Sequence, residues 1–211
     1  HKAQLNSPSQ QQTTSIQLDL ESVMKASQVL SGEIVLSRLL KKMVHLIIEN
    51  AGATRGLLIL EKDGQWMIEA EGFPDVEKVT VMQALPIEES EQVPATLINY
   101  VSRTRENVVL SDATGEGGFT KDAFIIKNRP KSVLVMPLLN RGILNGILYL
   151  ENNLTTGAFT RDRMQVITLL AFQAGISLEN ARLFEEKQQY ADKLADEIVE
   201  RKQAEAALQE S

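Results

Sequence analysis

The sequence predicts an α+β fold, in which helices flank a mostly antiparallel sheet. Three observations lead to this prediction. Apolar residues recur at helical spacing before residue 50, and short apolar segments separated by turn residues follow between 56 and 151. The stretch after residue 160 contains Gly175 but no proline, which favours one long final helix.

The N-terminal part is predicted to contain a flexible segment and two helices. Residues 1–16 are rich in Gln, Ser, Thr and Asn, and too little apolar surface is present to offset the entropy of ordering them. A first helix is expected to end near Ser31–Gly32, with an apolar face formed by Leu20, Val23, Met24, Ser27, Val29 and Leu30. A second begins near Glu33 and ends at 50–52, and its buried stripe consists of Leu36, Leu39, Leu40, Met43, Ile47 and Ile48.

The middle of the chain is predicted to form the sheet. Residues 56–60 and 66–70 make a hairpin around a turn at 61–64, and a weaker strand covers 79–82. A helix at 94–103, a strand at 108–110 and a loop-rich stretch at 111–130 follow, in that order. Segment 131–139 is apolar on both faces, so we expect it at the centre of a sheet that is covered on both sides. A turn at 140–142 connects it to an antiparallel partner at 146–151.

The final helix is predicted to contain nearly fifty residues and to end in a weak coiled coil. Eight positions from residue 184 onward follow heptad spacing, and five of them are apolar. These positions are Phe184, Lys187, Ala191, Leu194, Ile198, Arg201, Glu205 and Leu208. The alternative is a single solvated helix, because the seam is imperfect.

Composition excludes several classes of function. A formal net charge of −6 that is spread along the chain disfavours nucleic-acid binding, which depends on clustered cations. The absence of cysteine excludes disulfides, thiolate metal sites and cysteine nucleophiles. No apolar run approaches the roughly 18 residues that span a bilayer, so we expect no membrane segment. The absence of cysteine fits a cytoplasmic origin, which is the expected location. The chain begins with His1 and is interpreted as a piece of a longer protein.

Motifs for catalysis or metal binding are weak, and we predict no catalytic residue and no metal site. No Walker loop or GxGxxG motif is present, and 115–118 is interpreted as a flexible glycine-rich turn. His45 lies in an apolar segment, as expected for a packed or surface position of a helix. Asp112 and Asp122 are interpreted either as pocket residues or as a turn cap and a surface charge.

Several segments resemble the GAF domains of bacterial, particularly cyanobacterial, multidomain sensor histidine kinases. Residues 132–138 and 146–152 are similar to the last two strands of that family, and 157–163 to the start of its C-terminal helix. Residues 98–101 and 108–113 are similar to its middle helix and strand. We therefore assign 17–183 to a GAF domain and 184–211 to a helical output linker, because 197–208 resembles linkers that precede PAS or kinase modules.

The resemblance implies terminal helices on one face of the sheet, and loops and short helices over a small-molecule pocket on the other. It also implies a parallel homodimer through the terminal helices. The candidate ligand-binding residues are Asn99, Tyr100, Ser111, Asp112, Phe119, Lys121, Asp122, Phe124, Val133, Val135, Ile147 and Tyr149. The implied function is a sensory module that relays the binding of an unidentified small molecule or partner to a PAS or kinase module. A dimerisation spacer, with side chains filling the pocket, is the alternative.

Four known GAF activities are disfavoured by the residues of this chain. Covalent bilin attachment and the methionine-sulfoxide reductases of this fold both use cysteine, which is absent. Cyclic-nucleotide-binding members carry Asn-Lys, then Phe, three residues and Asp-Glu, whereas Asn152 is followed by Asn153 and the stretch after Phe159 lacks Asp-Glu. Haem would require an axial histidine, and His45 is predicted to lie on the wrong helix. We therefore expect no cofactor and no enzymatic activity in this fragment.

Overall fold

The computed structural model describes residues 28–75 and 79–209. The predicted flexible segment at 1–16 and the first four apolar positions of the first predicted helix (Leu20, Val23, Met24 and Ser27) lie outside these residues. Residues 28–31 are helical and Gly32 is a turn, so this helix ends where the sequence predicts.

The centre of the described structure is a six-stranded antiparallel sheet with the order β3–β2–β1–β6–β5–β4. The strands are β1 (Arg55–Lys62), β2 (Gln65–Gly72), β3 (Thr80–Pro86), β4 (Val108–Leu110), β5 (Ser132–Asn140) and β6 (Ile143–Asn152). Each of the six contains or overlaps a strand predicted from the sequence, and the α+β class is confirmed.

Two tight turns fix the register of the hairpins. Asp63 and Gly64 between β1 and β2 have φ angles of 51° and 78°, and Arg141 and Gly142 between β5 and β6 have φ angles of 49° and 80°. Two consecutive residues with positive φ form a type I′ turn, whose twist matches that of the flanking strands. Both turns lie where the sequence predicts them.

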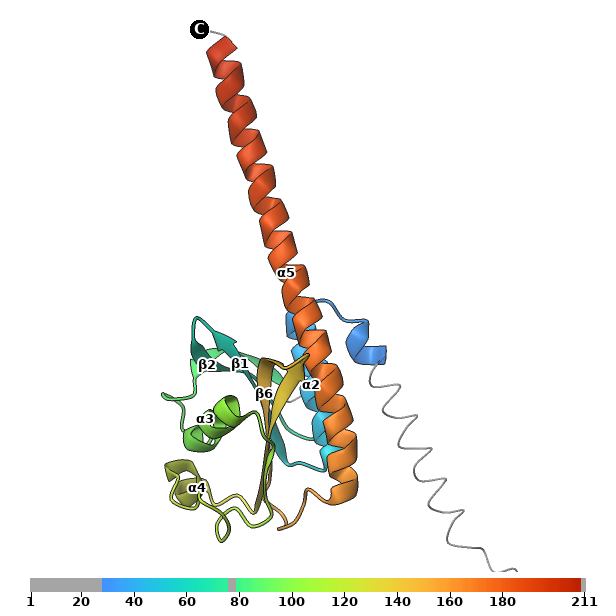
Figure 1. The fold of residues 1–211 in the computed structure, drawn as a ribbon, viewed down its shortest axis with the longest axis vertical. Coiled ribbons are helices and arrows are strands. Elements are labelled where there is room, and N and C mark those ends of the chain that lie inside the picture. Colours follow the sequence, from blue (N-terminus) through green and yellow to red (C-terminus); the bar gives the residue numbers. More distant parts are fainter. Residues whose placement is uncertain (1–27, 76–78, 210–211) are drawn as a thin grey trace, which may run out of the picture.

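The two faces of the sheet carry separate apolar cores. Helices α2 (Leu36–Ala51) and α5 (Arg161–Gln209) cover one face, whereas α3 (Ala95–Thr104) and α4 (Ala123–Asn128) lie over the other (Figure 1). Because successive side chains of a strand point to opposite faces, Leu148 of β6 packs toward α2 and α5. Its neighbour Tyr149 packs toward α3 and α4. The predicted placement of the terminal helices on one face is confirmed.

The structure corrects three details of the prediction. Strand β5 is second from an edge, and β1 and β6 are the central strands. The continuous apolar sequence of β5 reflects burial of both of its faces, because helices cover both faces of the sheet at this strand as well. The stretch at 111–130 contains α4, whose cap, Asp122, accepts a hydrogen bond from the backbone N–H of Phe124 at 2.8 Å. Strand β3 extends to Pro86 rather than ending at residue 82.

Helix α5 is a single helix of 49 residues, as predicted. Its buried side chains lie between Ile167 and Ala181, and the side chains from 182 to 204 are exposed. The first half therefore packs on the sheet, and the second half projects well beyond the domain (Figure 1). None of the helices in the described ranges combines the length and apolar character that crossing a bilayer requires.

Gly175 is the point of closest approach between α5 and β5. A Cβ atom at this position would lie 2.8 Å from the carbonyl oxygen of Leu139, which is backbone and cannot rotate away. The glycine costs helix propensity of about 1 kcal/mol relative to alanine. Close packing of the helix on the sheet offsets this cost.

We expect Gly175→Ala to lower the free energy of unfolding by about 1–3 kcal/mol, despite the better helix propensity of alanine, because α5 must move away from β5. Urea unfolding followed by circular dichroism measures the change. Gly118→Ala is the matched control, because a Cβ atom there meets nothing within 4 Å. Equal stability of the two variants would contradict the assigned contact.

Candidate functional site

A cavity of about 290 Å³ lies between the segment that connects β3 to α3 and the short helix α4. This volume lies just below the usual range for ligand pockets, which is roughly 300–1,000 Å³. Apolar and polar side chains both contribute to its walls. The lining residues are Ile87, Glu88, Ser90, Glu91, Val93, Ala95, Thr96, Asp122, Ala123, Phe124 and Lys127.

Asp122 is the buried polar side chain of this cavity, with 9% of its surface exposed. One carboxylate oxygen accepts the backbone N–H of Phe124 at 2.8 Å, and the other accepts the hydroxyl of Thr96. Thr96 lies in the first turn of α3, so the carboxylate is held between the two helices that cover this face of the sheet. Within the described ranges, Asp122 forms no ion pair.

An ion pair joins the two walls of the cavity. The ammonium of Lys127 on α4 contacts the carboxylate of Glu91 in the segment after β3. Both side chains are mostly exposed, so the pair adds little to stability. It does, however, bring the two walls together.

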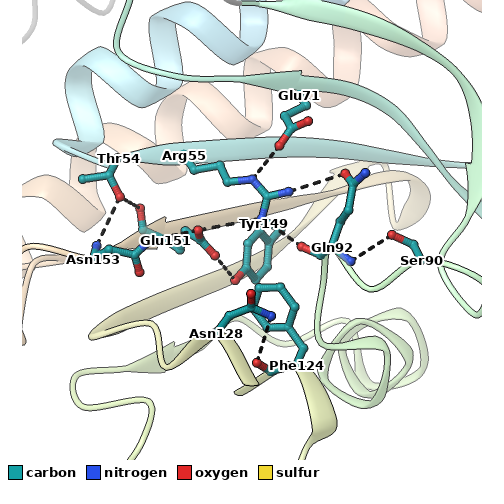
Figure 2. Close-up of polar contacts among 10 residues, drawn as sticks. All are labelled: Thr54, Arg55, Glu71, Ser90, Gln92, Phe124, Asn128, Tyr149, Glu151 and Asn153. Atoms are coloured by element: carbon teal, nitrogen blue, oxygen red, sulfur yellow. Dashed lines mark hydrogen bonds and ion pairs between the residues drawn. The ribbon is translucent and has the colours of Figure 1, made fainter. Parts of the chain in front are cut away.

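Beneath α4, Tyr149 connects the cavity wall to the sheet. Its ring meets that of Phe124 edge-on, with centroids 6.1 Å apart, and its hydroxyl donates a hydrogen bond to Glu151 at 2.6 Å (Figure 2). The side chain is fully buried. Burial, followed by the negative charge of Glu151, raises the pKa of Tyr149 well above its ordinary value, so the phenol is neutral at pH 7.

Arg55 of β1 ties the same region to three other segments. Its guanidinium donates to the Glu71 carboxylate of β2 at 2.6 Å and to the backbone carbonyl of Gln92 at 2.9 Å, and it lies 3.8 Å from Glu151 (Figure 2). We call Arg55, Glu71, Gln92, Glu151 and Tyr149 the Arg55 network. Gln92 immediately precedes Val93 of the cavity wall, so the network fixes that wall to the sheet.

The sequence analysis missed the charged members of the Arg55 network. Arg55 and Glu151 are directly opposite each other in the β1–β6 register, although 96 positions separate them in the chain. Once that register is known, a charge pair at this position is an expected cross-strand interaction. Without it, no local spacing points to the contact.

Most of the predicted site residues gather on one face of the sheet. Asp122 and Phe124 line the cavity. Four others belong to the apolar core beneath α3 and α4, namely Val133, Val135, Ile147 and Tyr149. Phe119 packs against this core, and its ring meets that of Tyr100 edge-on at 5.5 Å.

Of the twelve predicted residues, Asp122 and Phe124 alone line the cavity, and four others neither line it nor pack in the core beneath it. Asp112 lies in a turn, where its carboxylate accepts hydrogen bonds from the Thr114 hydroxyl and from two backbone N–H groups. The hydrogen bond from Thr114 is the main reason that the pKa of Asp112 is below its ordinary value. The carbonyl of Ser111 accepts the hydroxyl of Ser132 at 3.1 Å. Asn99 is half-buried on α3, and Lys121 is exposed.

Nothing in the described residues is arranged as a metal site, since no group of three or more His, Asp or Glu side chains converges there. His45 lies on α2, on the opposite face of the sheet from the cavity, with Nε2 3.7 Å from a carboxylate oxygen of Glu49.

The fold of the described residues is similar to that of solved GAF domains. The GAF domain of a phosphoenolpyruvate-protein phosphotransferase from Coxiella burnetii superimposes with a TM-score of 0.61 and 20% identity, covering 80% of this chain and 96% of that one. The family model of the GAF domain matches residues 35–178. The chain belongs to the GAF domain family.

Two curated relatives place similar domains in histidine kinases. The chain is 40% identical over 108 residues to hybrid signal transduction histidine kinase G of Dictyostelium discoideum, covering 50% of this chain and 3% of that protein. It is 28% identical over 168 residues to peroxide stress-activated histidine kinase mak3 of Schizosaccharomyces pombe, covering 79% of this chain and 7% of that protein. The chain thus spans a small part of these relatives. They support a sensor kinase context without a specific link to cyanobacteria.

The raised pKa of Tyr149 predicts how the stability of the domain depends on pH in alkaline solution. Its pKa is raised on folding, so its contribution to the free energy of unfolding is fully present below the unfolded pKa of about 10. That contribution is lost as the pH rises toward the folded pKa, at about 1.4 kcal/mol per pH unit. In Tyr149→Phe we expect a shallower loss of stability between pH 10 and 11, measured by urea unfolding.

The variant is also expected to be less stable at pH 7, by about 1–3 kcal/mol, because Glu151 loses a buried donor. Tyr190→Phe, at an exposed position of α5, controls for the loss of a tyrosine as such. Identical pH slopes for wild type and Tyr149→Phe would rule out the assigned coupling.

Proposed function

We propose that this chain is the sensory and regulatory module of a multidomain signalling protein with histidine kinase activity elsewhere in the parent chain. In this proposal, a small molecule binds in the cavity between the β3–α3 segment and α4. The observation that carries the proposal is the continuity of α5, which packs on the sheet with its first half and leaves the domain with its second. The histidine kinase relatives and the ligand-sized cavity support it.

Strand β6 provides the path from the cavity to α5. Tyr149 contacts Phe124 in the cavity wall, whereas its neighbours Leu148 and Leu150 pack in the core that contains α5. A ligand that displaces α4 would shift Tyr149 and, through the same strand, the surface on which α5 rests. Such a switch requires the ligand to bind one of two states more tightly than the other.

The start of α5 is anchored to the sheet, so it would follow a movement of β5 and β6. Arg163 donates to the carbonyl of Ala158 at 2.8 Å, and the N–H of Ala158 is bonded to the hydroxyl of Ser132 in β5 at 3.2 Å. On the other side, the Asn152 side chain at the end of β6 donates to the carbonyl of Gly52 at 2.8 Å, which follows α2.

The test is a thermal-shift screen of the purified chain against amino acids, polyamines, nucleotides and cyclic nucleotides. A ligand that binds only the folded state adds about 2.7 kcal/mol at a concentration a hundredfold above its dissociation constant. We expect Ala123→Phe, which fills the cavity, to abolish the shift. Ile126→Phe is the matched control, because Ile126 is exposed on the same helix and does not line the cavity.

Hydrogen exchange then tests the relay. Ligand should change the exchange rates of amides in α5 beyond residue 181, where the helix has left the sheet. A ligand that stabilises the domain but leaves these rates unchanged would argue for binding without output through α5.

The second candidate function is a dimerisation spacer, and a specific surface favours it. An apolar stripe follows one side of α5, opposite the side that packs on the sheet, over about 44 Å. Its exposed members are Leu169, Phe172, Leu183, Phe184, Tyr190, Leu194 and Ile198. A parallel dimer through this stripe would cover it, and such a dimer fits the sensor and the spacer alike.

We expect Leu194→Lys with Ile198→Lys to weaken dimerisation at least tenfold, because two charges per chain would enter the seam. Sedimentation equilibrium measures the change. Val199→Lys is the control, since Val199 is equally exposed but lies off the stripe. A wild-type chain that stays monomeric at all concentrations would exclude both the parallel dimer and the spacer.

A further inference from the structure

Negatively charged side chains outnumber positively charged ones around the cavity. Three carboxylates line it, those of Glu88, Glu91 and Asp122, against the single ammonium of Lys127. Lys127 is engaged by Glu91. An incoming anion would therefore have to displace a carboxylate from its partner, and the carboxylates of Glu88 and Asp122 would repel it.

Asp122 is the buried carboxylate among these groups, and it forms no ion pair within the described residues. Burial of a carboxylate without a cation is costly, because its two hydrogen bonds replace only part of the lost hydration. A carboxylate has about four acceptor positions, so the two donors from Thr96 and Phe124 leave it able to accept further hydrogen bonds. Because Asp122 lines the cavity, a ligand is positioned to supply them.

The core beneath the cavity does not neutralise this charge. The guanidinium of Arg55 is shared between the carboxylates of Glu71 and Glu151. Burial is the main cause of the raised pKa of Tyr149, and the negative charge of Asp122 adds a smaller contribution. The carboxylates of Asp122, Glu71 and Glu151 thus outnumber the one guanidinium of Arg55 at the inner end of the cavity.

We propose that the cavity takes a small organic cation, with an ammonium or guanidinium group against Asp122 and a short apolar chain against Ile87, Val93 and Phe124. This assignment rests on the proposed function, because it names the ligand class for the same cavity. The volume of about 290 Å³ limits the ligand to a compact metabolite. A charge-assisted hydrogen bond to a buried carboxylate supplies the specificity, since a neutral or anionic analogue leaves Asp122 uncompensated.

Three probes of matched shape test the charge preference: n-butylammonium, 1-butanol and butyrate, titrated at pH 7 and constant ionic strength into the isotope-labelled chain. Amide chemical shifts of Ala95, Thr96, Ala123 and Phe124 report on the cavity. We expect saturable shifts with n-butylammonium, at least tenfold weaker binding of 1-butanol, and no binding of butyrate.

Two variants test the residues. Asp122→Asn keeps a good helix cap but removes the charge. It should weaken the binding of n-butylammonium at least tenfold and leave the affinity for 1-butanol unchanged. Lys127→Ala removes the partner of Glu91 and should strengthen the binding of n-butylammonium two- to fivefold. Asp112→Asn is the control, because that carboxylate lies in a turn outside the cavity, and it should change neither affinity.

The outcomes separate this inference from the proposed function. Binding of 1-butanol or butyrate at the cavity amides, equal to or tighter than that of n-butylammonium, would overturn the cation assignment and leave the cavity as a ligand site. If none of the probes shifts these amides, the cation assignment is wrong, whereas the cavity as a sensory site stands or falls with the thermal-shift screen and the Ala123→Phe variant.

Discussion

The pairing of β6 with β1 and β5 is the constraint on which the rest of this structure depends. It joins the N-terminal hairpin to the C-terminal one in a single antiparallel sheet, and it places Arg55 opposite Glu151. The same register sets which side chains of β6 face the terminal helices and which face α3 and α4. A slip by one residue would exchange Tyr149 with its leucine neighbours and destroy both cores.

The Arg55 network shows why the cavity has a defined shape. In the segment after β3, Val93 is buried in the core, and the guanidinium of Arg55 holds the backbone carbonyl of the preceding Gln92 directly. A buried ion pair of this kind adds little net stability compared with an apolar substitute, but removing one partner leaves an uncompensated charge. Its contribution here is positional. It fixes one wall of the cavity to the strands that also carry Tyr149, which contacts the other wall.

The two halves of α5 are subject to different physical demands. Up to Ala181 the helix is held by apolar packing and by the close approach at Gly175, so its position follows the sheet. From 182 to 204 its side chains are exposed, and its exposed apolar stripe favours association with a second helix. Under the proposed function, a change in the sheet would be carried along α5 without a hinge.

Local patterns in the sequence were sufficient for every strand and for the longer helices of this fold. The helical stripe of α2, the two turns with consecutive positive φ and the uninterrupted run of α5 each depend on residues close together in the chain. The family could also be identified from segments such as 146–152. The position of β5 in the strand order could not be predicted from the sequence. An apolar strand indicates that both of its faces are covered, but it does not indicate which strands are its neighbours. The helix α4 was also missed, since six residues carry too short a pattern.

The candidate site was predicted in part, for the same reason. The family resemblance implied that Val133, Val135, Ile147 and Tyr149 share one face of the sheet, and the structure places all four in the core on that face. Asp112 and Asp122 were equivalent in the sequence, and only the packing of α4 against α3 buried one and left the other in a turn. The contacts of Arg55 with Glu71, Gln92 and Glu151 bridge segments that are distant in the chain. The sequence therefore determined the elements and their apolar faces, whereas charge pairing and the cavity were decided by tertiary structure, because both depend on which distant segments meet.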